Sequence, residues 1–216
     1  MDIKARMKGF YPVVDTSVVE PARVPSVAES IVRAGAGILQ LRAKSTSTAE
    51  FFRLATTLRN ITERAGIIFI VNDRVDVALL SRADGVHLGT EDIPPEETRR
   101  LLGRRAVIGF STHTPEELKE ADRLFRAGIV DYISFGPIFP TTTKKDARPT
   151  VGTELLKLVR ALTAAPIVAI GGITEENMEE VLCSGADAVS MISHVLTAPD
   201  IEEKVSSILG KIDYRL

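Results

Sequence analysis

Gln40, Arg42 and Lys44 alternate with apolar residues in the segment QLRAK. In an extended strand, residues two apart point to the same side of the sheet. An amide, a guanidinium and an ammonium therefore share one face of a segment that is otherwise apolar. Because burying unpaired cations is costly, we predict that this face binds an anion.

Two aspartates, Asp73 and Asp92, follow two later apolar runs of the chain. Carboxylates suit Mg²⁺, which usually takes one or two of them and completes its coordination with waters and substrate phosphates. Arg42 and Lys44 would donate charge-assisted hydrogen bonds to the same phosphate oxygens. The loop after the sixth apolar run adds three donors: Thr141, Thr143 and Lys144. Together these residues predict a diphosphate site with Mg²⁺.

A second anion site is predicted near the end of the chain. Gly171-Gly172 ends one apolar run and Ile192-Ser193 ends the next, and each pair opens a helix-like segment. Backbone N–H groups at helix N-termini bind phosphate, and barrel folds frequently carry a phosphate site after their last two strands. One diphosphate and one monophosphate indicate two substrates.

Purely structural roles stay open for the same residues. Asn72 and Asp73 could cap the helix that follows them, and Asp92 could be a turn or cap residue, because Asx residues favour these positions. Ser111 could likewise be a cap, and the cations of QLRAK could extend to solvent from a strand edge. We interpret His87, in the middle of a predicted strand, as a hydrogen-bonded core residue. Two other histidines near strand ends are weaker candidates for function: His113 and His194.

Eight short apolar runs alternate with longer amphipathic segments. We predict strands at residues 10–15, 38–43, 67–73, 85–89, 107–111, 131–137, 167–173 and 188–193. Helical segments between them include 48–66, 114–128 and one that starts at Thr174 and ends near Gly185. Strands that alternate with helices in this way are typical of a parallel α/β fold.

Two architectures fit this pattern: a closed (β/α)8 barrel and an open doubly wound sheet. Eight units in 216 residues suit a compact barrel, and the first predicted strand is not followed by the G-x-G-x-x-G motif of a dinucleotide-binding sheet. We therefore predict a single-domain (β/α)8 barrel over residues 1–216. Barrel enzymes place their chemistry at the C-terminal ends of the strands, where nearly all the polar candidates fall.

The composition narrows the choice of partners. The net charge of −2 and the pI near 6.0 give no reason to expect nucleic-acid or membrane partners. A single cysteine suits a reducing compartment, and no apolar stretch reaches the roughly 18 residues of a membrane span. We expect a cytoplasmic protein with small-molecule substrates. The oligomeric state stays open, and a homo-oligomer is compatible with an apolar helix face.

Seven motifs occur in order along the chain: QLRAK, VNDRVDVAL, ADGVHLGTEDIP, IGFSTHT, DYISFGPIFPTTTKKDARPTVG, PIVAIGGIT and GADAVSMIS. In this order and spacing they resemble the thiamine-phosphate synthase family, over nearly the whole chain. The resemblance implies a transferase of thiamine biosynthesis. It would join 4-amino-2-methyl-5-hydroxymethylpyrimidine diphosphate to 4-methyl-5-(2-phosphoethyl)thiazole, or its carboxylated relative, with release of thiamine monophosphate and pyrophosphate.

The resemblance also implies a role for each matching residue. The pyrimidine diphosphate is assigned to Gln40, Arg42, Lys44, Asn72, Ser111 and Lys144. The thiazole phosphate is assigned to Thr141, Thr143, Gly172, Ile192 and Ser193. Asp73 and Asp92 would hold Mg²⁺, and the catalytic residues would be Arg42, Lys44, Ser111 and Lys144. Thr90 stands where the family more often has Gln, which affects one minor contact.

Two other functions compete with a synthase. A thiazole tautomerase resembles it in fold but carries a histidine where this chain has Pro137, and it does not need the full diphosphate and metal set. A non-catalytic sensor of phosphorylated metabolites would not need Asp73, Asp92 and Lys144, which are all present.

For a synthase, we expect a dissociative substitution at the pyrimidine methylene carbon. We also expect the loop TTTKKDARPT to form a lid over the substrates.

Overall fold

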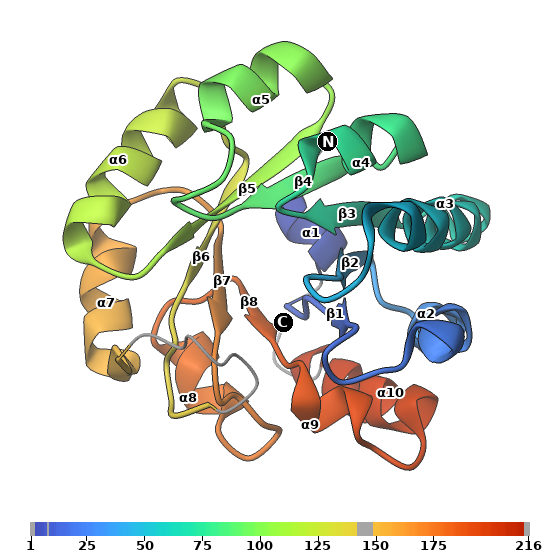
Figure 1. Cartoon of the computed structure of the whole chain (residues 1–216). Coiled ribbons are helices and arrows are strands. Elements are labelled where there is room, and N and C mark those ends of the chain that lie inside the picture. The colour runs from blue at the N-terminus through green and yellow to red at the C-terminus, as the bar shows by residue number, and fades with distance from the viewer. Residues whose placement is uncertain (1–2, 8, 142–148, 214–216) are drawn as a thin grey trace.

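Eight parallel strands form the barrel in the computed structural model, which describes residues 3–7, 9–141 and 149–213 (Figure 1). The strands are β1 (Val13–Asp15), β2 (Ile38–Arg42), β3 (Ile68–Asn72), β4 (Gly85–Leu88), β5 (Val107–Thr112), β6 (Tyr132–Phe135), β7 (Ile167–Ile170) and β8 (Ala188–Ser190). Each strand pairs in parallel with the next along the chain. The Tyr11 N–H donates to the Val189 carbonyl oxygen at 2.9 Å, which joins β8 to the start of β1. The predicted (β/α)8 barrel is confirmed.

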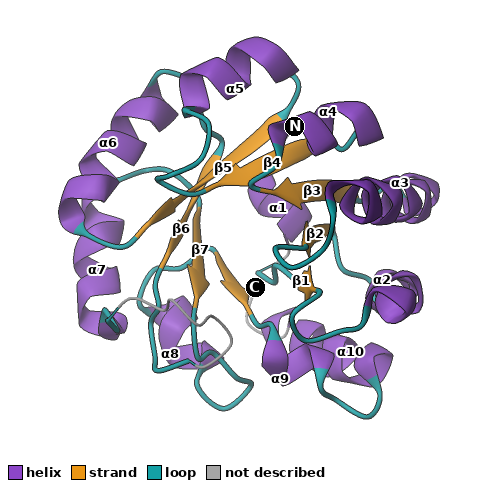
Figure 2. Cartoon of the chain, in the orientation of Figure 1, coloured by secondary structure: helices purple, strands orange, loops and turns teal. Residues whose placement is uncertain are grey.

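Helices surround the sheet on its outer side, except for α1, which lies at one end of the barrel (Figure 2). They are α1 (Ile3–Met7), α2 (Val24–Arg33), α3 (Thr48–Ala65), α4 (Val75–Ser81), α5 (Pro95–Leu102), α6 (Pro115–Arg126), α7 (Gly152–Leu162), α8 (Met178–Cys183), α9 (Ser193–Leu196) and α10 (Ile201–Asp213), with a 3-10 turn η1 (Pro21–Arg23) before α2. In the described part of the chain, none of these helices combines the length and the apolar character that a membrane crossing requires.

Local sequence signals account for the ends of two long helices. The Ser47 hydroxyl caps α3 by accepting the Glu50 N–H at 3.2 Å, and Gly66 ends the helix with a left-handed φ of 68°. Thr114 caps α6 in the same way, with Pro115 as the first helical residue. Hydroxyl caps satisfy free backbone N–H groups, and glycine adopts the left-handed conformation at little cost. Both helices therefore lie where the sequence predicted them.

Several predicted boundaries are wrong. Strand β1 starts at Val13 and not at residue 10, and β6 ends at Phe135 and not at residue 137. The helix expected to start at Thr174 begins instead at Met178, because the Thr174 N–H is bound by the Asn177 side chain in a separate turn at 2.8 Å. Strand β7 stops at Ile170 because Gly171 turns the chain with φ of 100°. Strand β8 likewise ends at Ser190, before the loop into α9.

An N-terminal helix that the sequence analysis did not predict lies across the barrel (Figure 1). The Arg6 guanidinium in α1 donates to the Gly66 carbonyl oxygen at 2.6 Å, just ahead of β3. A Cβ atom at Gly37, just ahead of β2, would lie 1.6 Å from the Arg6 carbonyl oxygen. Both contacts are at the N-terminal ends of strands. Helix α1 therefore packs at the end of the barrel opposite the one that carries the polar residues.

Candidate active site

A cavity of about 760 Å³ opens at the C-terminal ends of the strands. Gln40, Arg42 and Lys44 line it, whereas the intervening Leu41 and Ala43 are buried and do not. The alternation in QLRAK thus places all three polar side chains on one face, as predicted.

Most of the other predicted residues line the same cavity: Asn72, Asp73, Asp92, Ser111, Thr141, Gly172, Ile192 and Ser193. The weaker candidates His113 and His194 are also among its lining residues. Thr143 and Lys144, with most of the predicted lid, fall outside the described residues. Segments from all parts of the chain therefore meet at one mouth of the barrel.

Arg42 is held by an aspartate that the sequence analysis did not single out. Asp15, at the end of β1, is fully buried, and its Oδ2 accepts a hydrogen bond from Arg42 Nη1 at 2.5 Å. Its other oxygen accepts the Ser17 N–H at 2.9 Å. The Arg42 side chain is only 9% exposed, so it does not extend to solvent. A guanidinium has five N–H donors, and those not used by Asp15 can bind an anion in the cavity.

Lys44 joins the cationic face to the predicted metal ligands. Its ammonium lies 3.3 Å from Asp73 Oδ2, and about half of the Lys44 side chain is exposed. Asp73 has a left-handed φ of 63°, which is uncommon for a residue with a side chain. The N-cap position of helix α4 is occupied by Arg74 and not by Asn72 or Asp73, and the helix has no side-chain cap.

Asp92 does close a turn, because its Oδ2 accepts the Gly89 N–H at 2.6 Å. Burial raises the pKa of the Asp92 carboxyl to about 6, although the Gly89 N–H opposes the shift. The negative charge of the neighbouring Asp73 raises this pKa further. Two carboxylates that repel each other in a half-buried position favour a cation between them.

A network of hydroxyl groups and one imidazole lies deeper in the barrel. His87, at 8% exposure, contacts Tyr132 OH through Nδ1 at 3.0 Å and Ser111 Oγ through Nε2 at 2.9 Å. It is buried and hydrogen-bonded as the core interpretation expected, but it also lines the cavity. Burial raises the pKa of both Tyr11 and Tyr132 above the ordinary range, so both phenols stay protonated. Ser111 contacts this network and caps no helix.

Two glycines shape the side of the cavity formed by β7. Gly171 and Gly172 have positive φ values of 100° and 62°. A Cβ atom at Gly172 would lie 2.5 Å from the Pro140 carbonyl oxygen, so only glycine lets the two loops pass this closely. The Asn177 side-chain amide donates to the Gly172 carbonyl oxygen at 3.1 Å and fixes the turn. This turn lines the cavity together with Ile192 and Ser193. The residues of the predicted second anion site therefore lie around the same cavity.

A buried carboxylate supports the loop beyond this turn. Glu175 is 6% exposed and accepts hydrogen bonds from Lys204 at 2.6 Å and Lys211 at 2.9 Å, both in α10. Burial alone would raise the pKa of Glu175, but the two lysines and the Ser207 hydroxyl lower it to about 2. The ionised carboxylate therefore ties α10 to the β7–α8 loop next to the cavity.

A closed parallel barrel whose polar residues gather at the C-terminal ends of its strands defines the class of TIM-barrel enzymes. Solved structures support this class. Thiamine phosphate pyrophosphorylase from Pyrococcus furiosus superposes with a TM-score of 0.83 at 34% identity, covering 96% of this chain and 98% of that one.

Sequence comparison identifies the family within this class. The family model for thiamine monophosphate synthase matches residues 10–195. The thiamine-phosphate synthase of Methanocella arvoryzae is 40% identical over 208 residues, 96% of each chain. That of Lawsonia intracellularis is 38% identical over 199 residues, which cover 92% of this chain and 90% of the relative. The chain belongs to the thiamine monophosphate synthase family, and the resemblance found in the sequence motifs is confirmed.

Proposed function

We propose that the protein joins a pyrimidine diphosphate to a thiazole phosphate, giving thiamine monophosphate and pyrophosphate. The observation that carries this proposal is the meeting of Arg42 and Lys44 with Asp73 and Asp92 in one cavity. Cations beside a pair of carboxylates suit a diphosphate that is bound with a divalent metal. The identity of the two substrates is what the resemblance to the family implies, and the match to the family model supports it.

The reaction needs charge stabilisation more than it needs a nucleophile or a base. The bond between the methylene carbon and the diphosphate oxygen breaks, and its electron pair leaves with pyrophosphate. The thiazole nitrogen then forms the new C–N bond with its lone pair. Arg42 is already fixed by Asp15 before the charge develops, and such preorganised donors stabilise a transition state without reorganising. Lys44 would act beside it, and the resemblance assigns the same role to Lys144.

Mg²⁺ fits the carboxylate pair. Among the described residues there is no cluster of three or more metal-binding His, Cys, Asp or Glu side chains, so a metal here would have few protein ligands. Mg²⁺ tolerates this, because substrate phosphates and waters complete its coordination. Asp73 and Asp92 would hold it, because their carboxyl groups lie close enough to interact with each other. When bound, the ion would offset the negative charge of the leaving diphosphate.

The thiazole phosphate would bind on the other side of the cavity. The turn at Gly172 and the segment Ile192-Ser193 lie at the ends of adjacent strands β7 and β8, with Thr141 on the loop after β6. Glycines allow an anion to approach backbone N–H groups closely. In this proposal the diphosphate would bind over β2 to β4 and the monophosphate over β7 and β8. We also infer a cytoplasmic enzyme, which the single cysteine supports.

Pyrophosphate release on mixing both substrates tests the proposal. We expect stoichiometric pyrophosphate and thiamine monophosphate with Mg²⁺, and neither product after chelation. Asp92→Asn should lower the rate by about 10²–10³, the usual effect of removing one preorganised electrostatic group. Asp76→Asn is a matched control, because Asp76 pairs with Arg74 on the surface and does not line the cavity. Binding without turnover in the presence of Mg²⁺ would instead indicate a sensor.

A further inference from the structure

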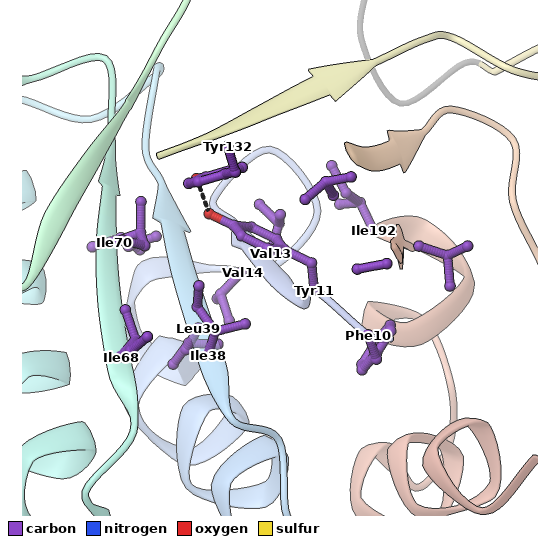
Figure 3. Close-up of a cluster of buried hydrophobic side chains, with 14 of the residues drawn as sticks. Phe10, Tyr11, Val13, Val14, Ile38, Leu39, Ile68, Ile70, Tyr132 and Ile192 are labelled. Atoms are coloured by element: carbon purple, nitrogen blue, oxygen red, sulfur yellow. Dashed lines mark hydrogen bonds between the residues drawn. The ribbon is translucent and has the colours of Figure 1, made fainter. Parts of the chain in front are cut away.

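A chain of hydrogen bonds crosses the floor of the cavity behind the predicted substrate-binding residues. Gln40 Oε1, Tyr11 OH, Tyr132 OH and His87 Nδ1 are joined in that order by contacts of 2.9, 2.6 and 3.0 Å. His87 Nε2 then lies 2.9 Å from Ser111 Oγ. Figure 3 shows the two tyrosines meeting inside the barrel. The chain thus links Gln40 on β2 to Ser111 on β5, and both of these ends line the cavity.

The backbone of β5 makes room for this chain. A Cβ atom at Gly109 would lie 2.1 Å from Tyr132 Cζ and 2.4 Å from His87 Nδ1. Any larger residue at this position would displace the phenol or the imidazole. Tyr132 is fully buried at the edge of the cavity that it helps to line, and its hydroxyl is shared between Tyr11 and His87.

The direction of each hydrogen bond follows from counting protons. The carbonyl oxygen Oε1 of Gln40 can only accept, so Tyr11 donates its one proton there. Tyr132 must then donate to Tyr11, which leaves Tyr132 to accept from His87 Nδ1. With Nδ1 donating to Tyr132, the neutral tautomer of the imidazole carries its lone pair on Nε2. Ser111 therefore donates its proton to His87.

These directions fix what the two ends offer a ligand. Ser111 makes the shorter contact to His87 Nε2, at 2.9 Å, and uses its proton there. Ser134 Oγ lies 3.3 Å from both His87 Nε2 and Ser111 Oγ, and it donates to one Ser111 lone pair. The second lone pair of Ser111 remains as an acceptor. Gln40 Nε2 donates one hydrogen to Asn72 Oδ1 at 3.0 Å and retains its second hydrogen as a donor. An acceptor and a donor placed at two sides of a cavity match a planar heterocycle with an amino group and a ring nitrogen.

We propose that Tyr132 is a positioning residue that holds Ser111 as an acceptor and Gln40 as a donor for the aminopyrimidine ring. The inference rests on the proposed function and adds residues that set its selectivity for the heterocycle. Removal of the Tyr132 hydroxyl takes away the donor to Tyr11 and the acceptor of His87 Nδ1–H. The directions of the other hydrogen bonds of Tyr11 and His87 are then no longer fixed. The site would then lose its fixed polarity while the diphosphate residues stay in place.

Calorimetric binding to Tyr132→Phe, with Mg²⁺ present, tests this inference. The dissociation constant for the pyrimidine diphosphate should rise about 10- to 100-fold, by analogy with the loss of partners that orient metal ligands. Affinity for pyrophosphate alone should stay that of wild type, because pyrophosphate does not contact the heterocycle end. Ser111→Ala should also cost less affinity in the Tyr132→Phe background than in wild type, since the two residues act as a unit.

Two further variants complete the design. Thr153→Val is the matched control, because it deletes a hydroxyl that donates to Glu180 at 2.7 Å between α7 and α8, away from the cavity; its affinity for both ligands should be unchanged. If Tyr132→Phe is unfolded by circular dichroism, Tyr11→Phe replaces it. Tyr11→Phe frees Gln40 Oε1 and should weaken binding of the pyrimidine diphosphate in the same way.

The outcomes separate the two proposals. If wild type binds pyrophosphate but not the pyrimidine diphosphate, the proposed function fails and this inference falls with it. If wild type binds both, and the folded tyrosine variant binds the pyrimidine diphosphate as tightly as wild type, only the positioning role is overturned. Equal loss of affinity for pyrophosphate would also overturn it, because that result indicates general damage to the site.

Discussion

Asp15→Asn isolates the role of the buried carboxylate behind Arg42. Asp15 uses both oxygens, one for the Arg42 guanidinium at 2.5 Å and the other for the Ser17 N–H at 2.9 Å. Asparagine is nearly the same size but has a single acceptor oxygen, so one of these bonds is lost. It also carries no charge, and the guanidinium then lies buried without its counter-ion.

The expected destabilisation follows from this burial. Removing one partner of a buried ion pair typically costs about 3–5 kcal/mol. Asparagine still accepts one hydrogen bond and Arg42 borders the cavity, so we expect the lower end, about 3 kcal/mol. For a chain of 216 residues, that change should lower Tm by roughly 6–12 °C, taking about 2–4 °C for each kcal/mol.

Thermal unfolding with and without pyrophosphate and Mg²⁺ measures this effect. The ligand should raise Tm more in Asp15→Asn than in wild type, because the diphosphate restores an anionic partner to Arg42. Glu202→Gln is the control, since Glu202 and Arg33 form a largely exposed pair at 2.8 Å, and such pairs contribute under about 1 kcal/mol. If the Tm of Asp15→Asn equals that of this control within error, the buried pair does not stabilise the fold by the expected amount.

Three other predictions concern catalysis, pH and packing. Lys44→Ala should lower the steady-state rate of pyrophosphate release by about 10²–10³ with Tm nearly unchanged, because Lys44 is half exposed in its pair with Asp73; a wild-type rate would contradict its role. Glu175→Gln should destabilise the protein by roughly 1–2 kcal/mol at neutral pH, reduced from the full shift because the partner lysines are partly exposed. Because folding lowers the pKa of Glu175, its ionised carboxylate stabilises the fold at pH values above the unfolded-state pKa of 4.5. This stabilisation is lost as the pH falls toward the folded-state pKa of about 2. The free energies of unfolding of variant and wild type, measured in urea, should therefore converge over that window. Gly109→Ala should cost about 1–3 kcal/mol in urea unfolding, because its Cβ would lie 2.1 Å from Tyr132 Cζ; an unchanged midpoint would refute this.

Much of the fold could be predicted because its signals are local. The apolar runs that become strands and the caps at Ser47 and Thr114 each depend on residues close together in the chain. The start of α8 could not be predicted in this way. Thr174 looks like a cap, but Asn177 binds its N–H, and lysines of the distant α10 hold Glu175 out of the helix.

The candidate site was also predictable only where it depends on residues close together in the chain. The spacing of QLRAK is enough to place Gln40, Arg42 and Lys44 on one face, because alternation along a strand is a property of the backbone. Their predicted roles toward substrate remain proposals. Asp15 escaped notice because nothing near it in the chain is basic; only the pairing of β1 with β2 brings it opposite Arg42.

The sequence by itself determined the barrel, the family and the strand ends that carry polar side chains, since periodicity, caps and motifs are written in consecutive residues. Only the tertiary structure decided which polar groups hold one another. Tyr11 lies just ahead of β1, Tyr132 on β6 and His87 on β4, with no pattern in the chain that joins them. Their hydrogen bonds depend on closure of the barrel. Closure brings segments that are far apart in the sequence close enough for Tyr132 OH to lie 2.6 Å from Tyr11 OH and 3.0 Å from His87 Nδ1.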